Sequence, residues 1–159
     1  MVKIINIADP HVDATSVGTW DQDKGMHSNW VESFARLNDV VDAANEQKAD
    51  FLVVDGDLFD TGKPTAEAVG LTVDAFRRLD NTKVILLDGN HDQQGVVASH
   101  RTPIAAYFSS LPGIYAVSTP QVLEVDGMKF ALAPWLRVAG KSKIKNISDE
   151  LKAVIERLS

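Results

Sequence analysis

The sequence contains no cysteine, which excludes disulfide bonds and thiolate metal sites and is typical of a protein of the reducing cytoplasm. Basic residues are in the minority, with 16 Lys and Arg against 22 Asp and Glu, so the formal net charge is −6. No overall basic field would draw the chain to nucleic acid, although a local patch or bound cations could still do so. Long apolar runs are lacking too. The run Val2–Ala8 is far too short for a membrane span or a signal-peptide core, and we expect no membrane association.

What the chain does contain is enough apolar sequence for one folded unit. Its 159 residues are 45% hydrophobic, which suits a single domain with a real core and is too short for two. No repeat, low-complexity tract or linker-like segment marks a boundary. We therefore expect residues 1–159 to form a single domain.

Strands and helices alternate in the first part of the chain. Three apolar runs predict strands, at Val2–Ala8, Phe51–Val54 and Val84–Leu87. The first run is rich in isoleucine, which favours a central strand covered on both faces. Between these strands, helical spacing predicts a helix from an N-cap at Asn29 to about Lys48 and a second helix that opens at Pro64. The predicted fold class is therefore α/β, a βαβαβ core with a mainly parallel sheet.

The apolar face of the second helix is expected at Val69, Val73, Phe76 and Leu79. The stretch from Asp13 to Ser28 is polar and without period, which predicts a long loop.

A change of pattern follows in the later part of the chain. A short helix is predicted over Pro103–Ser110 and a strand over Ile114–Val117. The pair Asp126-Gly127 lies between two alternating runs and predicts an antiparallel hairpin. A last helix is expected, capped by Ser148, with an apolar stripe at Leu151, Val154, Ile155 and Leu158.

Three short motifs carry the candidate chemistry, each at the end of a predicted strand: Asp9-Pro10-His11, Gly56-Asp57-Leu58-Phe59-Asp60 and Gly89-Asn90-His91-Asp92. In open parallel sheets, ligands bind outside the carboxyl ends of the strands, which is where all three motifs lie. Their carboxylate, amide and imidazole groups suit hard divalent cations. Each motif alone is more simply a turn or a loop. The three in this order, each after an apolar strand, favour a metal site.

The residue types suggest a different role for each residue around two metal ions. Asp9 and His11 are separated by one residue and can approach one ion together. Asp57 is placed to bridge the two ions, and Asn90 offers a carbonyl oxygen to the second. His91 is then free to act as the catalytic acid, with Asp92 as its orienting partner.

Asp60 is expected as a hydrogen-bond acceptor behind the ligands. Other candidates are weaker: His27 and His100 are expected on the surface, and Trp135 in core or rim packing rather than as a base-stacking platform. Lys141, Lys143 and Lys145 beside Arg137 are expected to be a solvated face, with contact to a phosphate backbone as the alternative.

These motifs resemble the calcineurin-like metallophosphoesterases, and the segment Gly56-Asp57-Leu58-Phe59-Asp60-Thr61-Gly62 is similar to the second motif of the SbcD-type DNA repair nucleases. Asp126-Gly127-Met128-Lys129-Phe130 and Pro134-Trp135-Leu136-Arg137 look like the same branch. The resemblance spans essentially the whole chain. It implies an α/β/β/α sandwich, with the strands and helices above as part of it.

The resemblance also implies a set of functional assignments. Two manganese ions, with magnesium or another divalent ion as alternatives, would be held by Asp9, His11, Asp57 and Asn90, with His91 as the catalytic histidine. The substrate would be DNA, cut by exonuclease or endonuclease action, and the partner an ATPase of the SbcC type.

The chain departs from the family pattern at the histidines. Such nucleases add one later histidine ligand and a Gly-His-x-His segment, whereas no histidine follows His100 here. We expect that the chain is a fragment of a longer nuclease, half of a split enzyme completed by a complementary polypeptide, or a shortened relative. Four ligands shared between two ions predict weak metal binding, above all at the second ion.

Two other functions stay open at this point. A small-molecule phosphodiesterase or phosphatase would use the same ions. A non-catalytic accessory module of a nuclease complex would keep the fold and bind a partner.

Overall fold

A computed structural model describes residues 1–92, 105–135, 149 and 152–156 of the chain. Its centre is a sheet of four strands in the order β1-β4-β5-β6. All neighbouring strands in this sheet are parallel, as predicted from the alternation of strands and helices. The strands are β1 (Ile4–Ile7), β4 (Phe51–Asp55), β5 (Lys83–Leu87) and β6 (Ile114–Val117).

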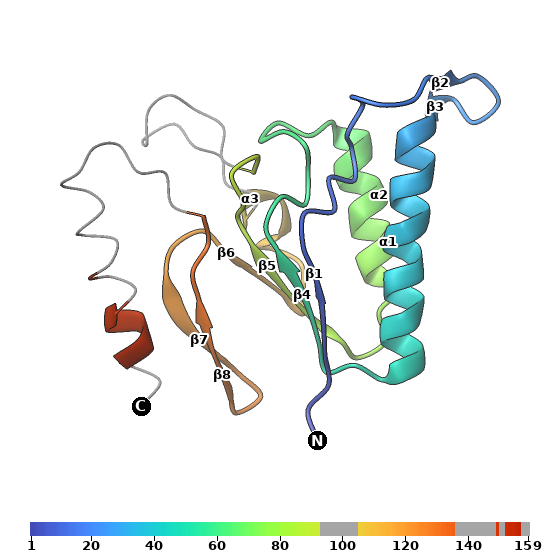
Figure 1. Cartoon of the computed structure of the whole chain (residues 1–159). Coiled ribbons are helices and arrows are strands. Elements are labelled where there is room, and N and C mark those ends of the chain that lie inside the picture. Colours follow the sequence, from blue (N-terminus) through green and yellow to red (C-terminus); the bar gives the residue numbers. More distant parts are fainter. Residues whose placement is uncertain (93–104, 136–148, 150–151, 157–159) are drawn as a thin grey trace.

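Helices cover one face of this sheet. The long helix α1 (Ser28–Gln47) lies beside α2 (Ala66–Arg77), and α3 (Ala105–Phe108) contributes Phe108 to the same core (Figure 1). The side chains of Leu52 and Val54 from β4 point into this core. Of the helix predicted over Pro103–Ser110, residues 105–108 are helical and residues 109–110 form a turn, while residues 103–104 lie outside the described residues.

A hairpin covers the other face. It consists of β7 (Gln121–Val125) and β8 (Met128–Leu132), joined by the predicted turn, in which Asp126 and Gly127 both have positive φ. Phe51 of β4 contacts Phe130 of the hairpin, with ring centroids 4.8 Å apart. Successive residues of β4 thus enter opposite cores, which is why this strand is apolar throughout.

The first strand is less buried than predicted. Within the described part of the chain, β1 is an edge strand that pairs only with β4, and Ile4 is 48% exposed. Ile5 and Ile7 are half-buried against the helices. Within the described residues β1 is therefore not the central strand that we predicted, because a β-branched run favours a strand without fixing how many of its faces are covered.

The start of α1 also differs from the prediction. The N-cap is His27, not Asn29, and its Nδ1 accepts the backbone N–H of Asn29 at 3.3 Å. The predicted loop before it contains a small antiparallel pair, β2 (Trp20–Asp21) and β3 (Met26–His27). Strands of two residues are too short to produce a visible alternation in the sequence.

Two further predicted helices are present, and their buried faces agree with the predictions in part. Helix α2 begins at Ala66 behind the N-cap Thr65, and its fully buried residues are Ala68, Thr72, Ala75 and Phe76. Of the predicted apolar face, Phe76 is buried, and Val69, Val73 and Leu79 are partly buried against the same core. Residues 152–156 are helical, with Val154 buried but Ile155 61% exposed, so the predicted stripe is wrong at Ile155. Ser148, Leu151 and Leu158 of that prediction lie outside the described residues. Among the helices that are described, none is long and apolar enough to cross a membrane.

Candidate metal centre

The three motifs meet at the carboxyl ends of β1, β4 and β5. The backbone N–H of His11 donates to the carbonyl of Asp57 at 3.0 Å, and that of Val12 donates to Leu58 at 3.0 Å. The third motif joins through a side chain, because the N–H of His91 donates to Asp57 Oδ1 at 2.8 Å. Asp57 therefore contacts both of the other motifs. It is 5% exposed.

Left-handed backbone is concentrated here. Five non-glycine residues of the described chain have positive φ, and three of them are Asp9 (49°), His11 (41°) and Asp57 (47°). Such conformations are uncommon for non-glycine residues and are often found at functional sites. These conformations turn the backbone sharply where it leaves β1 and β4, which directs the side chains of the two motifs toward one another.

A glycine makes the close approach of the second and third motifs possible. A Cβ atom built on Gly89 would lie 2.1 Å from Asp57 Oδ1 and 2.2 Å from the Asp57 backbone nitrogen. Any side chain at this position would displace Asp57. The glycine of the third motif is therefore a packing requirement of the site.

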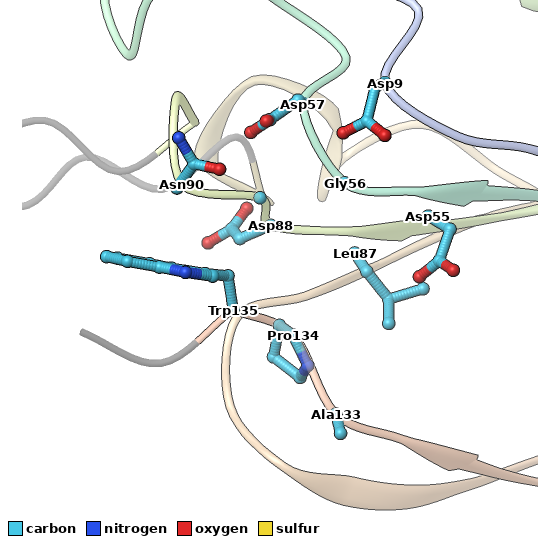
Figure 2. Close-up of a pocket in the computed structure, with 11 residues that line it drawn as sticks. Asp9, Asp55, Gly56, Asp57, Leu87, Asp88, Asn90, Ala133, Pro134 and Trp135 are labelled. Carbon is cyan, nitrogen blue, oxygen red and sulfur yellow. The ribbon is translucent and has the colours of Figure 1, made fainter. Parts of the chain in front are cut away.

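Two groups of ligand atoms result, and within each group all atoms lie within 4.8 Å of one another. One group comprises Asp9, His11 and Asp57, and the other comprises His11, Asp60 and His91. The carbonyl and carboxylate oxygens and imidazole nitrogens fit divalent cations such as manganese or magnesium by ligand type. Asn90 lines a cavity of about 260 Å³ together with Asp9 and Asp57 (Figure 2).

Comparison with protein families gives one decisive match. Residues 2–153 match the family described as calcineurin-like phosphoesterase. The chain belongs to this family. Its members hydrolyse phosphoesters with divalent metal ions, and the two groups of His and Asp side chains at the strand ends are candidate ligands for such ions.

Two curated relatives of this phosphoesterase align with part of it. The DNA double-strand break repair protein Mre11 of Saccharolobus solfataricus is 29% identical over 94 residues, which are 58% of this chain and 23% of the relative. The uncharacterized metallophosphoesterase YhaO of Bacillus subtilis is 32% identical over 97 residues, which are 59% of this chain and 24% of the relative. The matched region thus spans about a quarter of each relative.

Among solved structures, the Pseudomonas putida nuclease MPE is similar with a TM-score of 0.47 and 22% identity. The similarity covers 76% of this phosphoesterase and 50% of that chain.

His91 is held by a main-chain group. Its Nδ1 lies 2.9 Å from the carbonyl oxygen of Asp60, which can only accept, so Nδ1 carries a proton. This hydrogen bond raises the pKa of His91, and the nearby charges of Asp57, Asp60 and Asp92 act in the same direction. The imidazolium form of His91 is thereby favoured.

Asp60 lies between the two histidines of the site. Its Oδ1 is 3.2 Å from His11 Nδ1 and 3.7 Å from His91 Nδ1. The rings of His11 and His91 meet edge to face, with centroids 4.8 Å apart. Asp60 contacts both rings, and its carboxylate also belongs to one of the candidate ligand groups, so its expected role behind the ligands stays a prediction.

Asp92 lies elsewhere than expected. Instead of orienting the His91 ring, its carboxylate is fully buried and accepts the backbone N–H groups of Gly89 at 2.8 Å and Phe59 at 3.3 Å. Burial raises the pKa of Asp92 to about 6. Adjacent residues in a turn direct their side chains apart, which explains why the carbonyl of Asp60, and not Asp92, contacts the ring.

Two buried acids were not predicted from the sequence. Asp13 accepts the N–H of Asp60 at 2.6 Å, and burial raises its pKa. Asp88 is 2% exposed and precedes Gly89 directly. Asp88 directly precedes a motif and Asp13 lies two residues after His11, but nothing in the sequence pattern separates a buried aspartate from a solvated one.

The weaker candidates are placed as follows. Trp135 lines the cavity and is 42% exposed, so it is not a core residue, and the choice between rim packing and base stacking stays open at this point. His27 caps α1 and is half-buried, not a surface residue. His100, Arg137, Lys141, Lys143 and Lys145 lie outside the described residues.

Proposed function

We propose that this phosphoesterase is the metal-binding part of a DNA nuclease of SbcD type that cuts phosphodiester bonds with two manganese ions. The observation that supports the proposal most strongly is the convergence of Asp9, His11 and Asp57 within 4.8 Å at the strand ends. The relative described as a double-strand break repair protein supports DNA as the substrate. In this proposal Asp9, His11, Asp57 and Asn90 would hold the ions, with Asp57 as the carboxylate that would serve both and Asn90 as a ligand of the second.

Bound divalent cations would activate a water for in-line attack and neutralise charge on the phosphoryl oxygens. The protein's own residues would orient the ligand carboxylate and the catalytic imidazole, and would donate a proton to the leaving oxygen. The N–H of His91 fixes the Asp57 carboxylate, and the carbonyl of Asp60 fixes the His91 ring. With Nδ1 held in this way, Nε2 of the imidazolium is the nitrogen that gives its proton to the leaving oxygen.

Asp92 has a supporting role in this proposal. By accepting the N–H groups of Gly89 and Phe59, it holds the second and third motif loops together beneath Asp57. Asp60 contacts both histidines and would keep their rings in place when cations enter.

The partners of the chain are also part of the proposal. Further histidine ligands would come from a complementary polypeptide or from another part of a longer nuclease, and an ATPase of the SbcC type would assemble with the nuclease. We also propose that residues 1–159 act as one domain, in the cytoplasm. Two cores on opposite faces of one sheet support a single unit.

The proposal is tested by measuring Mn²⁺ binding calorimetrically and cleavage of linear DNA by the same preparation. Asp57→Asn removes the bridging carboxylate, and Asp39→Asn, on the exposed side of α1, is the matched control. We expect Asp57→Asn to abolish cleavage and weaken Mn²⁺ binding, and Asp39→Asn to change neither. Cleavage that survives in Asp57→Asn would contradict the proposal.

Two other outcomes would identify a different function. Metal-dependent hydrolysis of a chromogenic phosphodiester without any cutting of DNA would indicate a small-molecule phosphodiesterase. Failure to bind Mn²⁺ at millimolar concentration, together with stable association with an ATPase or a complementary fragment, would indicate an accessory module.

A further inference from the structure

The cavity beside the candidate metal ligands has two unlike walls. One wall carries polar groups, the amide of Asn90 and the carboxylates of Asp9, Asp55, Asp57 and Asp88. The other carries Pro134 and the indole of Trp135, which Figure 2 shows edge-on below Asn90 and Asp88. The indole is 42% exposed although it is one of the largest apolar groups of the chain.

The main chain fixes the position of the Trp135 segment relative to the ligands. The N–H of Trp135 donates to the carbonyl of Asp88 at 2.8 Å, and the N–H of Asp88 donates to Val117 at 3.1 Å. Asp88 directly precedes the third motif. The segment that follows β8 is therefore attached to the loop that carries Asn90.

A ligand that matches both walls has a phosphate next to a flat apolar group. Its phosphate would lie at the polar wall, where bound cations offset the charge of the carboxylates. Its flat group would lie on the indole, and nucleobases stack on such side chains with little dependence on sequence, because every base has a π-face. A cavity of about 260 Å³ is at the small end of ligand sites and suits one base rather than a duplex.

We propose that the Trp135 indole is a stacking platform for one unpaired nucleobase of the substrate, whose phosphate enters between Asp9, Asp57 and Asn90. This inference rests on the proposed nuclease function and specifies its substrate. Bases inside a duplex have both faces covered by their neighbours, so only a single-stranded, frayed or terminal base can offer a face to the indole. The proposal therefore assigns the site to single-stranded DNA or open ends.

The test uses binding, so that it does not depend on catalysis. Calorimetry in the presence of Mn²⁺ compares thymidine monophosphate with inorganic phosphate for the wild-type chain, Trp135→Ala, Trp135→Phe and the control Trp20→Ala. Trp20 is 63% exposed and lies outside the lining of this cavity. We expect Trp135→Ala to bind the nucleotide about tenfold more weakly and phosphate as before, with Trp135→Phe close to wild type.

Three results would overturn the inference. They are unchanged nucleotide binding in Trp135→Ala, an equal loss for inorganic phosphate, and a wild-type chain that does not bind thymidine monophosphate at millimolar concentration. Nucleotide binding that depends on Trp135 in a chain that cuts no DNA would contradict the proposed nuclease activity and leave the stacking site intact.

Discussion

The buried carboxylate of Asp13 accepts the backbone N–H of Asp60 at 2.6 Å. Asp60 in turn contacts His11 and His91, so Asp13 acts on both histidines without touching substrate. The carbonyl of Asp13 also accepts Trp30 Nε1 at 2.7 Å, which attaches the loop after β1 to α1. One aspartate therefore connects the helix layer to the loop that positions the histidines.

We predict that Asp13→Ala lowers the free energy of unfolding by about 1–3 kcal/mol, because the N–H of Asp60 loses its acceptor in a partly buried position. Asp13→Asn keeps an acceptor oxygen and should lose much less. Urea denaturation of the metal-free chain measures both. Equal losses in the two variants would show that the charge of Asp13, rather than its hydrogen bond, is what matters.

A second prediction concerns the contact between Gly89 and Asp57. Gly89→Ala places a Cβ atom on the Asp57 carboxylate and should weaken Mn²⁺ binding about tenfold to a hundredfold, the range found when a group that orients a ligand is lost. Calorimetric titration with Mn²⁺ gives the affinity.

The matched control for that variant is Gly70→Ala. Gly70 lies in α2 with no atom within 4 Å of a Cβ built on it, so alanine should stabilise the protein by about 0.5–1 kcal/mol and leave the Mn²⁺ affinity unchanged. If Gly89→Ala bound the metal as tightly as Gly70→Ala, the close approach would have no role in ligand placement.

A third prediction is a pH dependence of stability that comes from Asp92. Its folded-state pKa is about 6, above the ordinary value of 3.8, so the folded chain binds the proton more tightly than the unfolded chain. Stability from this group is therefore fully present below about pH 4 and is lost as the pH rises to about 6, up to about 3 kcal/mol. Asp13, whose pKa is also raised, contributes in the same direction.

The measurement is urea unfolding in the presence of a chelator between pH 4 and 7. Asp92→Asn cannot ionise, so the difference in unfolding free energy between wild type and this variant should change across that window. A difference that does not vary with pH would refute the assignment to Asp92.

A fourth prediction separates His91 from the metal ligands. His91→Ala keeps the backbone N–H that fixes Asp57, so Mn²⁺ affinity should stay within about twofold of wild type, while kcat for DNA cleavage falls about 10²–10⁴-fold through loss of the proton donor. A loss of metal binding as large as that of Asp57→Asn would instead place His91 among the ligands.

The sequence was sufficient for the order of elements because most of them carry strong local signals. The run Phe51–Val54 predicted β4, and Asp126-Gly127 predicted the hairpin. The sequence was not sufficient to predict which neighbours pack against or pair with each element. The isoleucines of β1 do not reveal an edge strand, and the two-residue strands β2 and β3 have no period to detect.

The same division applies to the site. Adjacency to a strand end predicted that the three motifs would meet at one edge of the sheet, and Asp9, Asp57 and Asn90 line one cavity there. The hydrogen-bond partners could not be predicted, since they depend on how the turns pack: the carbonyl of Asp60 holds His91, and Asp92 turns to the backbone of Gly89. The metal-ligand roles themselves stay predictions until a cation is titrated.

Two backbone hydrogen bonds, from His11 to Asp57 and from Val12 to Leu58, limit the insertions and deletions that the protein can tolerate. Deleting or inserting one residue between Ile7 and His11 would shift the register of these hydrogen bonds and move the His11 imidazole away from the carboxylate of Asp57. The tip of the β2–β3 hairpin has no such constraint, because Gly25 has positive φ and no atom within 4 Å of a Cβ built there. A fluorophore, an affinity tag or a short inserted peptide for following the protein should therefore be attached at this tip.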